Sequence, residues 1–185
     1  MTAFYPLSHA RRALDAAFSF VSQTSALILD VSRNGGGDDE TADAVFATLV
    51  PTAATRPFDI EFRNRVEPAG PSPERSWDDY GDARPVAVII GRQSFSAPEA
   101  LAYALQQAGR ATLVGRQTAG GANMLDDANA AGDLFLVGVP TRRPLGLSSR
   151  SNWEAIGVRP DVAAGDGDAE MIAWEFVRRQ LVNSP

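Results

Sequence analysis

Apolar runs alternate with helical patterns along most of the chain. Residues 26–31 form a continuous apolar run that is typical of a strand covered on both faces. Further strands are predicted at 57–63, 86–90, 111–115 and 134–140. Apolar positions three or four residues apart predict helices over 9–22, 39–49, 96–109 and 168–181. Strands that alternate with helices predict an α/β fold in a single layered domain spanning residues 1–185.

Two polar stretches interrupt this pattern. Residues 64–85 hold four prolines and many charges, which predicts a long surface loop. Within it, Trp77 and Tyr80 either line a cleft or fasten the loop to the body of the protein. Residues 141–152 are rich in arginine and serine and predict no regular element.

Composition limits the classes of partner. Apolar residues make up 44% and charged residues 22% of the 185 residues, as in ordinary globular proteins. The net charge of −6 argues against nucleic acid as a partner, because phosphate binding needs a basic face. No apolar run reaches the roughly 18–20 residues that cross a bilayer. The first residues lack the basic-then-apolar pattern of a signal peptide, so we expect nothing in this chain to export it.

The side-chain inventory is unusually restricted. The chain has no cysteine and no lysine, which excludes thiolate catalysis, disulfides, cysteine-based zinc sites and a Ser–Lys dyad. We expect no metal or cofactor. His9 is the only histidine, so a general base must be His9, a carboxylate or a group outside this chain. His9 lies at the predicted start of the first helix, after Ser8 as a possible N-cap, where histidines are usually solvated.

The segment Gly35-Gly36-Gly37 follows a predicted strand and precedes a predicted helix. Glycines let a ligand approach the backbone without a Cβ in the way, and amides at a helix start can bind an oxyanion. The alternative is a flexible connection that leads to two acidic helix-capping residues, Asp38 and Asp39.

Ser96 lies where a predicted strand turns into a helix. The sequence Ser96-Ala97-Pro98-Glu99 fits a capping box, which would make the serine purely structural. A nucleophile can occupy the same place, with its hydroxyl exposed and the Ala97 amide contributing to an oxyanion hole.

Glu154 follows Trp153 in a polar stretch and precedes the turn Arg159-Pro160-Asp161. It would either orient a catalytic base near Ser96 or form a surface ion pair with one of the many arginines.

Three ordered blocks carry a family resemblance: LILDVSRNGGG (27–37), VAVIIGRQSFSAPEALAYALQQAGRATLVGRQTAGG (86–121) and NWEAIGVRPDV (152–162). Together they resemble the catalytic core of the tail-specific (C-terminal processing) and tricorn-core serine peptidases. That family also includes the retinoid-binding repeats of interphotoreceptor retinoid-binding protein. The resemblance covers residues 4–182 and implies a ClpP/crotonase-like fold of stacked β-β-α units.

The resemblance assigns roles position by position. Ser96 matches the nucleophile, Ala97 and the Gly35, Gly36 and Gly37 turn match the oxyanion amides, and Glu154 matches the glutamate that supports the catalytic histidine in tricorn-like members. Gly121 stands where tail-specific members carry a lysine, so the resemblance implies the Ser-His-Glu branch. The arginine of the family's Asp-Leu-Arg-x-Asn-Gly-Gly-Gly motif is displaced by one residue, to Arg33.

The resemblance therefore implies a serine peptidase core that acts on peptides or proteins and can assemble into homo-oligomers. The family's histidine lies upstream of this core, so we expect that an N-terminal helical cap is missing from these residues. Relatives are often periplasmic or secreted. The alternative is an inactive module on the same fold that binds a peptide or an apolar ligand. Acyl-CoA chemistry of the crotonase type is a third reading, but no residue pattern points to CoA.

Overall fold

A four-stranded parallel sheet forms the centre of the molecule, with strand order β1-β4-β5-β9. The computed structural model describes residues 1–51, 54–70, 80–81, 83–125, 128–131 and 134–183. The strands of this sheet are β1 (Leu27–Asp30), β4 (Val86–Ile90), β5 (Thr112–Gly115) and β9 (Val162–Ala163). Their parallel pairing places the carboxyl ends of all four strands at one edge.

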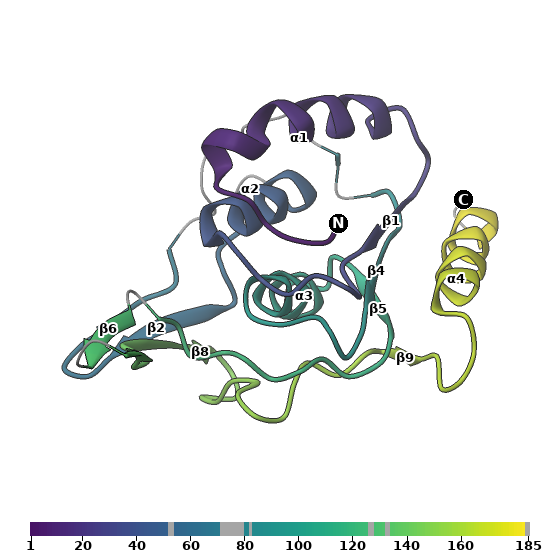
Figure 1. Ribbon diagram of the computed structural model, residues 1–185. Coiled ribbons are helices and arrows are strands. Elements are labelled where there is room, and N and C mark those ends of the chain that lie inside the picture. Colours follow the sequence, from purple (N-terminus) through teal and green to yellow (C-terminus); the bar gives the residue numbers. More distant parts are fainter. Residues whose placement is uncertain (52–53, 71–79, 82, 126–127, 132–133, 184–185) are drawn as a thin grey trace.

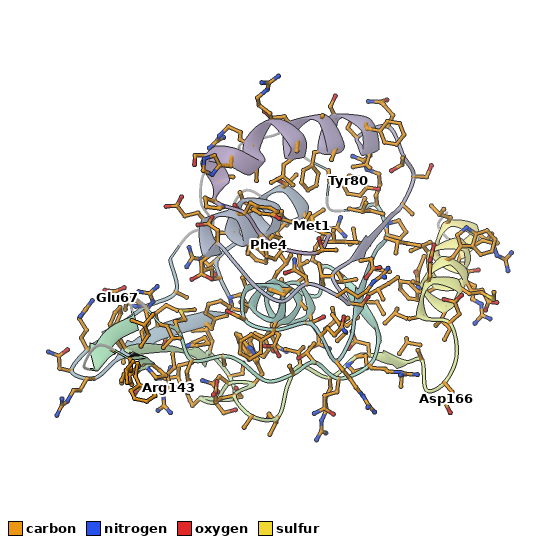
Figure 2. All side chains as sticks on the ribbon, in the orientation of Figure 1. Met1, Phe4, Glu67, Tyr80, Arg143 and Asp166 are labelled. Carbon is orange, nitrogen blue, oxygen red and sulfur yellow. The ribbon has the colours of Figure 1, made fainter. Side chains whose placement is uncertain are left out.

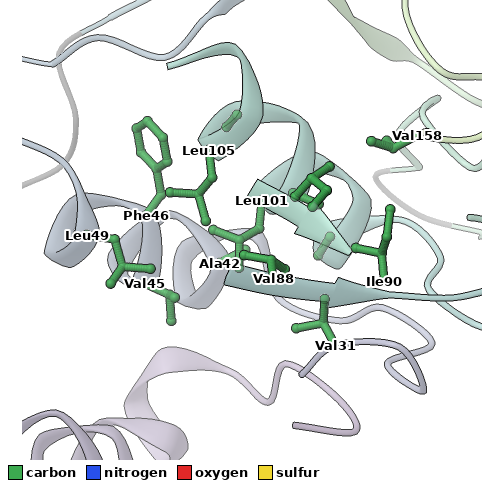
Figure 3. Close-up of a cluster of buried hydrophobic side chains, with 14 of the residues drawn as sticks. Val31, Ala42, Val45, Phe46, Leu49, Val88, Ile90, Leu101, Leu105 and Val158 are labelled. Carbon is green, nitrogen blue, oxygen red and sulfur yellow. The ribbon is translucent and has the colours of Figure 1, made fainter. Parts of the chain in front are cut away.

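Helices cover both faces of this sheet. Three helices, α1 (Leu7–Val21), α2 (Asp39–Leu49) and α3 (Ala97–Gln107), lie on one side, and α4 (Ala169–Asn183) lies on the other (Figure 1). Strand β4 is apolar at every position because both of its faces are covered. On one face, Val86, Val88 and Ile90 pack towards the first three helices. Figure 3 shows Val88 beside Leu101 of α3, and Leu105 of α3 beside Phe46 of α2.

The other face of β4 has its own, smaller core. Ala87 and Ile89 pack with Ala173 and Val177 of α4. Successive strand residues point to opposite faces, so every residue of a centrally placed strand must be apolar when both faces are covered.

Two smaller antiparallel sheets extend from this body. One has the order β3-β2-β8, and the other is a hairpin of β6 and β7. Their strands are β2 (Phe58–Phe62), β3 (Val66–Glu67), β8 (Arg142–Gly146), β6 (Ala128–Ala131) and β7 (Phe135–Gly138). Glu67 and Arg143 mark the outer end of the first of these sheets in Figure 2.

The α/β fold class predicted from the sequence is confirmed, and most predicted elements are present. The stretch 64–85 nevertheless contains β3, and the stretch 141–152 contains β8, which pairs with β2 along its whole length. Tyr80 is only 1% exposed and bonds to Thr24, so it fastens its loop rather than lining a cleft. Trp77 lies outside the described residues. No helix in the described part of the chain is long and apolar enough to span a bilayer.

Candidate active site

Three loops meet at the carboxyl edge of the parallel sheet, one after each of β1, β4 and β5. Hydrogen bonds tie them together: the Ser94 hydroxyl donates to the Val31 carbonyl at 2.7 Å, and the Phe95 amide donates to the Asn34 carbonyl at 3.1 Å. The Ala119 amide donates to the Ser94 carbonyl at 3.0 Å. Ser94 and Asn34 are fully buried, so these bonds are shielded from competing water. The loops therefore form one structural unit.

Ser96 precedes the first residue of α3 in an uncommon backbone conformation, with φ 67° and ψ −120°. Residues with a Cβ rarely adopt this conformation, and it persists only where the surroundings enforce it. The predicted capping box with Glu99 is present: the Ser96 amide donates to the Glu99 carboxylate at 2.7 Å. A residue that caps a helix does not need a positive φ, so the capping role of Ser96 does not explain its backbone conformation.

Glu99 enforces this arrangement from inside the protein. It is fully buried, and its carboxylate accepts hydrogen bonds from three backbone amides: Ser96, Gly120 at 2.8 Å and Gly121 at 2.8 Å. The Thr118 hydroxyl is a fourth donor. Four donors stabilise a buried negative charge that would otherwise be very unfavourable. Sequence reasoning assigned Glu99 only to the cap and missed that it also fixes the loop after β5.

The triglycine turn lies directly against Ser96. A Cβ at Gly36 would be 3.0 Å from the Phe95 carbonyl oxygen, 3.3 Å from the Ser96 Cβ and 3.9 Å from its Oγ. Gly36 and Gly37 have φ of 116° and 134°, which also favour glycine. Both findings explain why this close approach needs glycine.

The predicted oxyanion donors differ in their hydrogen bonding. The Gly36 amide already donates to the buried Asn34 side-chain oxygen at 3.0 Å. For the Gly35, Gly37 and Ala97 amides, by contrast, no acceptor is found within the described residues. Phe4 pairs with the turn by donating to the Gly36 carbonyl and accepting from Asp38, so the Gly37 amide points away from Phe4.

Glu154 belongs to the segment between β8 and β9. Its neighbour Trp153 is buried and lies against Tyr103 of α3, with ring centroids 4.9 Å apart. The exposed Glu154 carboxylate accepts the Ala122 amide at 2.7 Å and the Asn123 amide at 2.9 Å, both through Oε2. The loop 118–123 is thus held at one end by Glu99 and at the other by Glu154. The predicted ion pair of Glu154 with an arginine is absent among the described residues.

Gly121 occupies the place expected for a lysine in tail-specific relatives. A Cβ at this position would collide with the ring of Phe95. A side chain at Gly121 would therefore require the half-exposed Phe95 ring to move.

His9 is exposed on α1, which Figure 1 shows separated from α3 by α2. The prediction that Ser8 caps this helix is wrong: the N-cap is Pro6, and the helix begins at Leu7. Because Pro6 already provides the turn into the helix, both Ser8 and His9 lie within its first turn and face solvent.

A cavity of about 240 Å³ lies between α2, α3 and β2. Its wall includes Ala100 and Leu101 on the first turns of α3, and Met124 just after the loop 118–123. Asp43 contributes a carboxylate, which pairs with Arg56 at 2.6 Å. Burial raises the pKa of Asp43 to about 6, although Arg56 acts in the opposite direction. Sequence reasoning did not identify this cavity.

Comparisons with known proteins agree with this architecture. The photosystem II D1 C-terminal processing protease superimposes with a TM-score of 0.71 at 25% identity, covering 88% of this chain and 40% of that chain. A putative S41 protease from Bacteroides fragilis gives a TM-score of 0.73 at 16% identity, covering 96% of this chain and 50% of that one. The tricorn protease gives 0.58 at 17% identity, covering 97% and 17%. The chain thus spans half or less of the length of these three proteins.

The model of peptidase family S41 matches residues 1–164. This match covers most of the chain and includes all three sequence blocks, the Ser96 turn, the triglycine turn and Glu154. The resemblance inferred from those blocks is confirmed, and the chain belongs to peptidase family S41.

Proposed function

We propose that this chain is the catalytic core of a serine peptidase in which Ser96 is the nucleophile. The observation that carries the proposal is the Ser96 backbone, which Glu99 holds at φ 67° while the side chain lies against Gly36. Family membership and the likeness to processing proteases support the same reaction class.

In the proposed reaction, the Ser96 oxygen attacks the carbonyl carbon of a peptide bond, and the carbonyl oxygen becomes an oxyanion. The amides of Ala97, Gly35 and Gly37, which have no acceptor within the described residues, are the donors that would stabilise it. Ala97 is the first residue of α3, where the helix dipole adds partial positive charge. Gly36 is not one of the proposed oxyanion donors, because its amide already donates to the Asn34 side chain. Its role in this proposal is structural.

We further propose that the general base is a histidine outside these 185 residues. It would take the proton from the Ser96 hydroxyl and return it to the leaving amine. Glu154 would orient it: Oε2 is fixed by two amides, whereas Oε1 has no partner among the described residues and can accept an imidazole N–H.

Fluorophosphonate labelling of the intact chain tests the nucleophile. We expect the reagent to modify Ser96, and added imidazole to accelerate the reaction because it replaces the missing base in solution. Ser96→Ala abolishes labelling, while Ser8→Ala, which removes an exposed hydroxyl on α1, leaves it unchanged. Labelling that survives Ser96→Ala, or no labelling of the unaltered chain even with imidazole, would contradict the proposal.

A further inference from the structure

Arginine side chains surround the carboxyl edge of the parallel sheet. Each of the three loops that build the candidate active site begins with one: Arg33 follows β1, Arg92 follows β4 and Arg116 follows β5. Arg159, just before β9, is the fourth. All four are exposed. None of them was singled out for binding by the sequence pattern, because they are far apart along the chain.

Two adjoining depressions bring these side chains together. One, of about 370 Å³, is lined by Arg33, Arg92 and Arg116. The other, of about 490 Å³, is lined by Arg92, Arg116 and Arg159. Because Arg92, Arg116 and Gly115 line both, the two depressions form one continuous surface beside the loop that leads to Ser96. We call this surface the arginine edge.

The charges on the arginine edge are poorly neutralised. Arg116 donates to the Gly165 carbonyl at 2.9 Å and lies 3.6 Å from Asp166, whose side chain is fully exposed and projects outwards (Figure 2). Arg33, Arg92 and Arg159 have no hydrogen bond or ion pair with their side chains among the described residues. Of the acidic residues that the structure describes, Asp166 is the one that lines either depression.

Two acidic residues nearby in the sequence, Asp30 and Asp168, do not line the depressions and bond to backbone amides. Asp30 accepts the Ser32 amide at 2.8 Å, and Asp168 accepts the Glu170 amide at 2.9 Å at the start of α4. Among the described residues that line the two depressions, four arginines therefore face one aspartate, on a chain whose net charge is −6. Such a local field attracts anionic ligands even when the whole protein is acidic.

We propose that the arginine edge binds acidic segments of polypeptide substrates, with clustered Asp or Glu side chains close to the bond to be cut. Guanidinium groups match carboxylates in geometry and charge, and four of them can hold several carboxylates at once. Nucleic acid is the less favoured ligand, because the chain belongs to a peptidase family, whose substrates are polypeptides. The position relative to the cleaved bond rests on the proposed function, whereas the binding itself does not.

Binding is measured in the Ser96→Ala background, so that its outcome does not depend on peptide hydrolysis. A fluorescent glutamate-rich peptide is titrated by anisotropy, alongside the same peptide with glutamine in place of each glutamate. We expect only the acidic peptide to bind. Raising the ionic strength from about 0.1 M to about 1 M shortens the Debye length from about 10 Å to about 3 Å and should abolish binding.

Arg92→Gln/Arg159→Gln is the test variant, because neither side chain has a hydrogen bond or ion pair within the described part of the chain whose loss would disturb the fold. We expect it to weaken binding about tenfold. The matched control is Arg11→Gln/Arg12→Gln, which removes the same charge from exposed positions on α1 and should leave binding unchanged. Equal loss in both variants, equal binding of the glutamine peptide, or tighter binding of a single-stranded oligonucleotide would overturn the proposal.

Arginine modification provides a second measurement that needs no variant. Phenylglyoxal reacts with guanidinium groups, and the chain has no lysine to compete for the reagent. Peptide mapping should show that the acidic peptide protects Arg92 and Arg159 but not Arg11. Undiminished modification of Arg92 and Arg159 in the presence of saturating peptide would overturn the proposal.

Discussion

The starts of α2 and α3 perform the same structural task in different ways. Both helices begin after a loop that follows a parallel strand, and both have a polar N-cap. Asp38 caps α2 in ordinary extended geometry (φ −73°, ψ 125°), with its side chain accepting the Thr41 amide. Ser96 begins α3 at φ 67°, with a buried glutamate bonded to its own amide. The two caps thus differ in backbone conformation and in the partner that holds them, and the unusual conformation belongs to the serine that we propose as the nucleophile.

The largest effect is expected from Glu99→Gln. An amide cannot accept four hydrogen bonds, so its NH₂ group must face buried donors, at a cost of about 3 kcal/mol. For a chain of this length the melting temperature should fall by roughly 6–12 °C, and Ser96 should lose its reactivity with fluorophosphonate.

The matched change at the other helix is Asp38→Asn. Asparagine caps helices about as well as aspartate, so we expect a loss below about 0.5 kcal/mol. Thermal unfolding followed by circular dichroism measures both variants. Equal losses would show that the two helix starts are energetically equivalent.

The second-largest effect is the change of stability with pH that Asp43, the carboxyl group of α2 that lines the cavity, should cause. Burial raises the pKa of Asp43 to about 6 from 3.8, so the folded state binds this proton more tightly than the unfolded state does. The stability that Asp43 contributes is fully present below pH 3.8 and is lost as the pH rises through about 6.

Urea unfolding between pH 4 and about 7 measures this loss, which we expect to be about 2 kcal/mol relative to Asp43→Asn, whose side chain does not titrate. A difference between the two proteins that does not vary with pH would contradict the raised pKa. A difference that grows in favour of Asp43 with rising pH would show that the ion pair with Arg56 outweighs burial.

Gly36→Ala tests the close approach of the triglycine turn to Ser96. The added methyl group would lie 3.0 Å from the Phe95 carbonyl oxygen in a backbone with φ 116°, so we expect a loss of about 2 kcal/mol. Labelling of Ser96 should slow at least about tenfold, because the methyl displaces the Ser96 loop. Gly35→Ala is the control: nothing lies within 4 Å of the added Cβ, and stability should change by less than about 0.5 kcal/mol.

The smallest effect is the change in the free energy of unfolding when each N-cap residue, Ser96 or Asp38, is replaced by glycine. Ser96→Gly relieves the strain of a positive φ and should raise the free energy of unfolding by about 1 kcal/mol while abolishing labelling. Asp38→Gly removes a cap of ordinary geometry together with its hydrogen bonds to Leu7 and Thr41, and should lower the free energy of unfolding by about 1 kcal/mol. Chemical denaturation gives both values, and a loss of stability in Ser96→Gly would refute strain at this serine.

The central sheet could be predicted because the apolar sequence of its strands indicates that they are buried on both faces. Strand β4 is apolar at every position since both of its faces are covered. The start of α3 could also be predicted, because Ser96, Pro98 and Glu99 form a capping motif within four consecutive residues. Strand β8 was not, because its arginines lie on a small, partly exposed sheet and its partner β2 is about 80 residues away in the sequence.

The hydrogen bonds within the site could not be predicted from the sequence either. Glu99 reads as a local capping residue, yet it bonds to Gly120 and Gly121 more than 20 residues away. The engagement of the Gly36 amide by Asn34 depends on a turn geometry that three consecutive glycines leave open. The residue types were visible in the sequence, whereas their pairing is a property of the folded chain.

The Thr118 hydroxyl has a consequence for how the site becomes aligned. It donates to Glu99 and accepts the Val158 amide at 2.7 Å, which connects the Ser96 turn to the segment that carries Glu154. A series of hydrogen bonds therefore connects Ser96, through Glu99 and Thr118, to Val158 in the segment that carries Glu154. For the proposed reaction, the site would then need little reorganisation when a substrate binds, and preorganised polar groups lower an activation barrier most effectively.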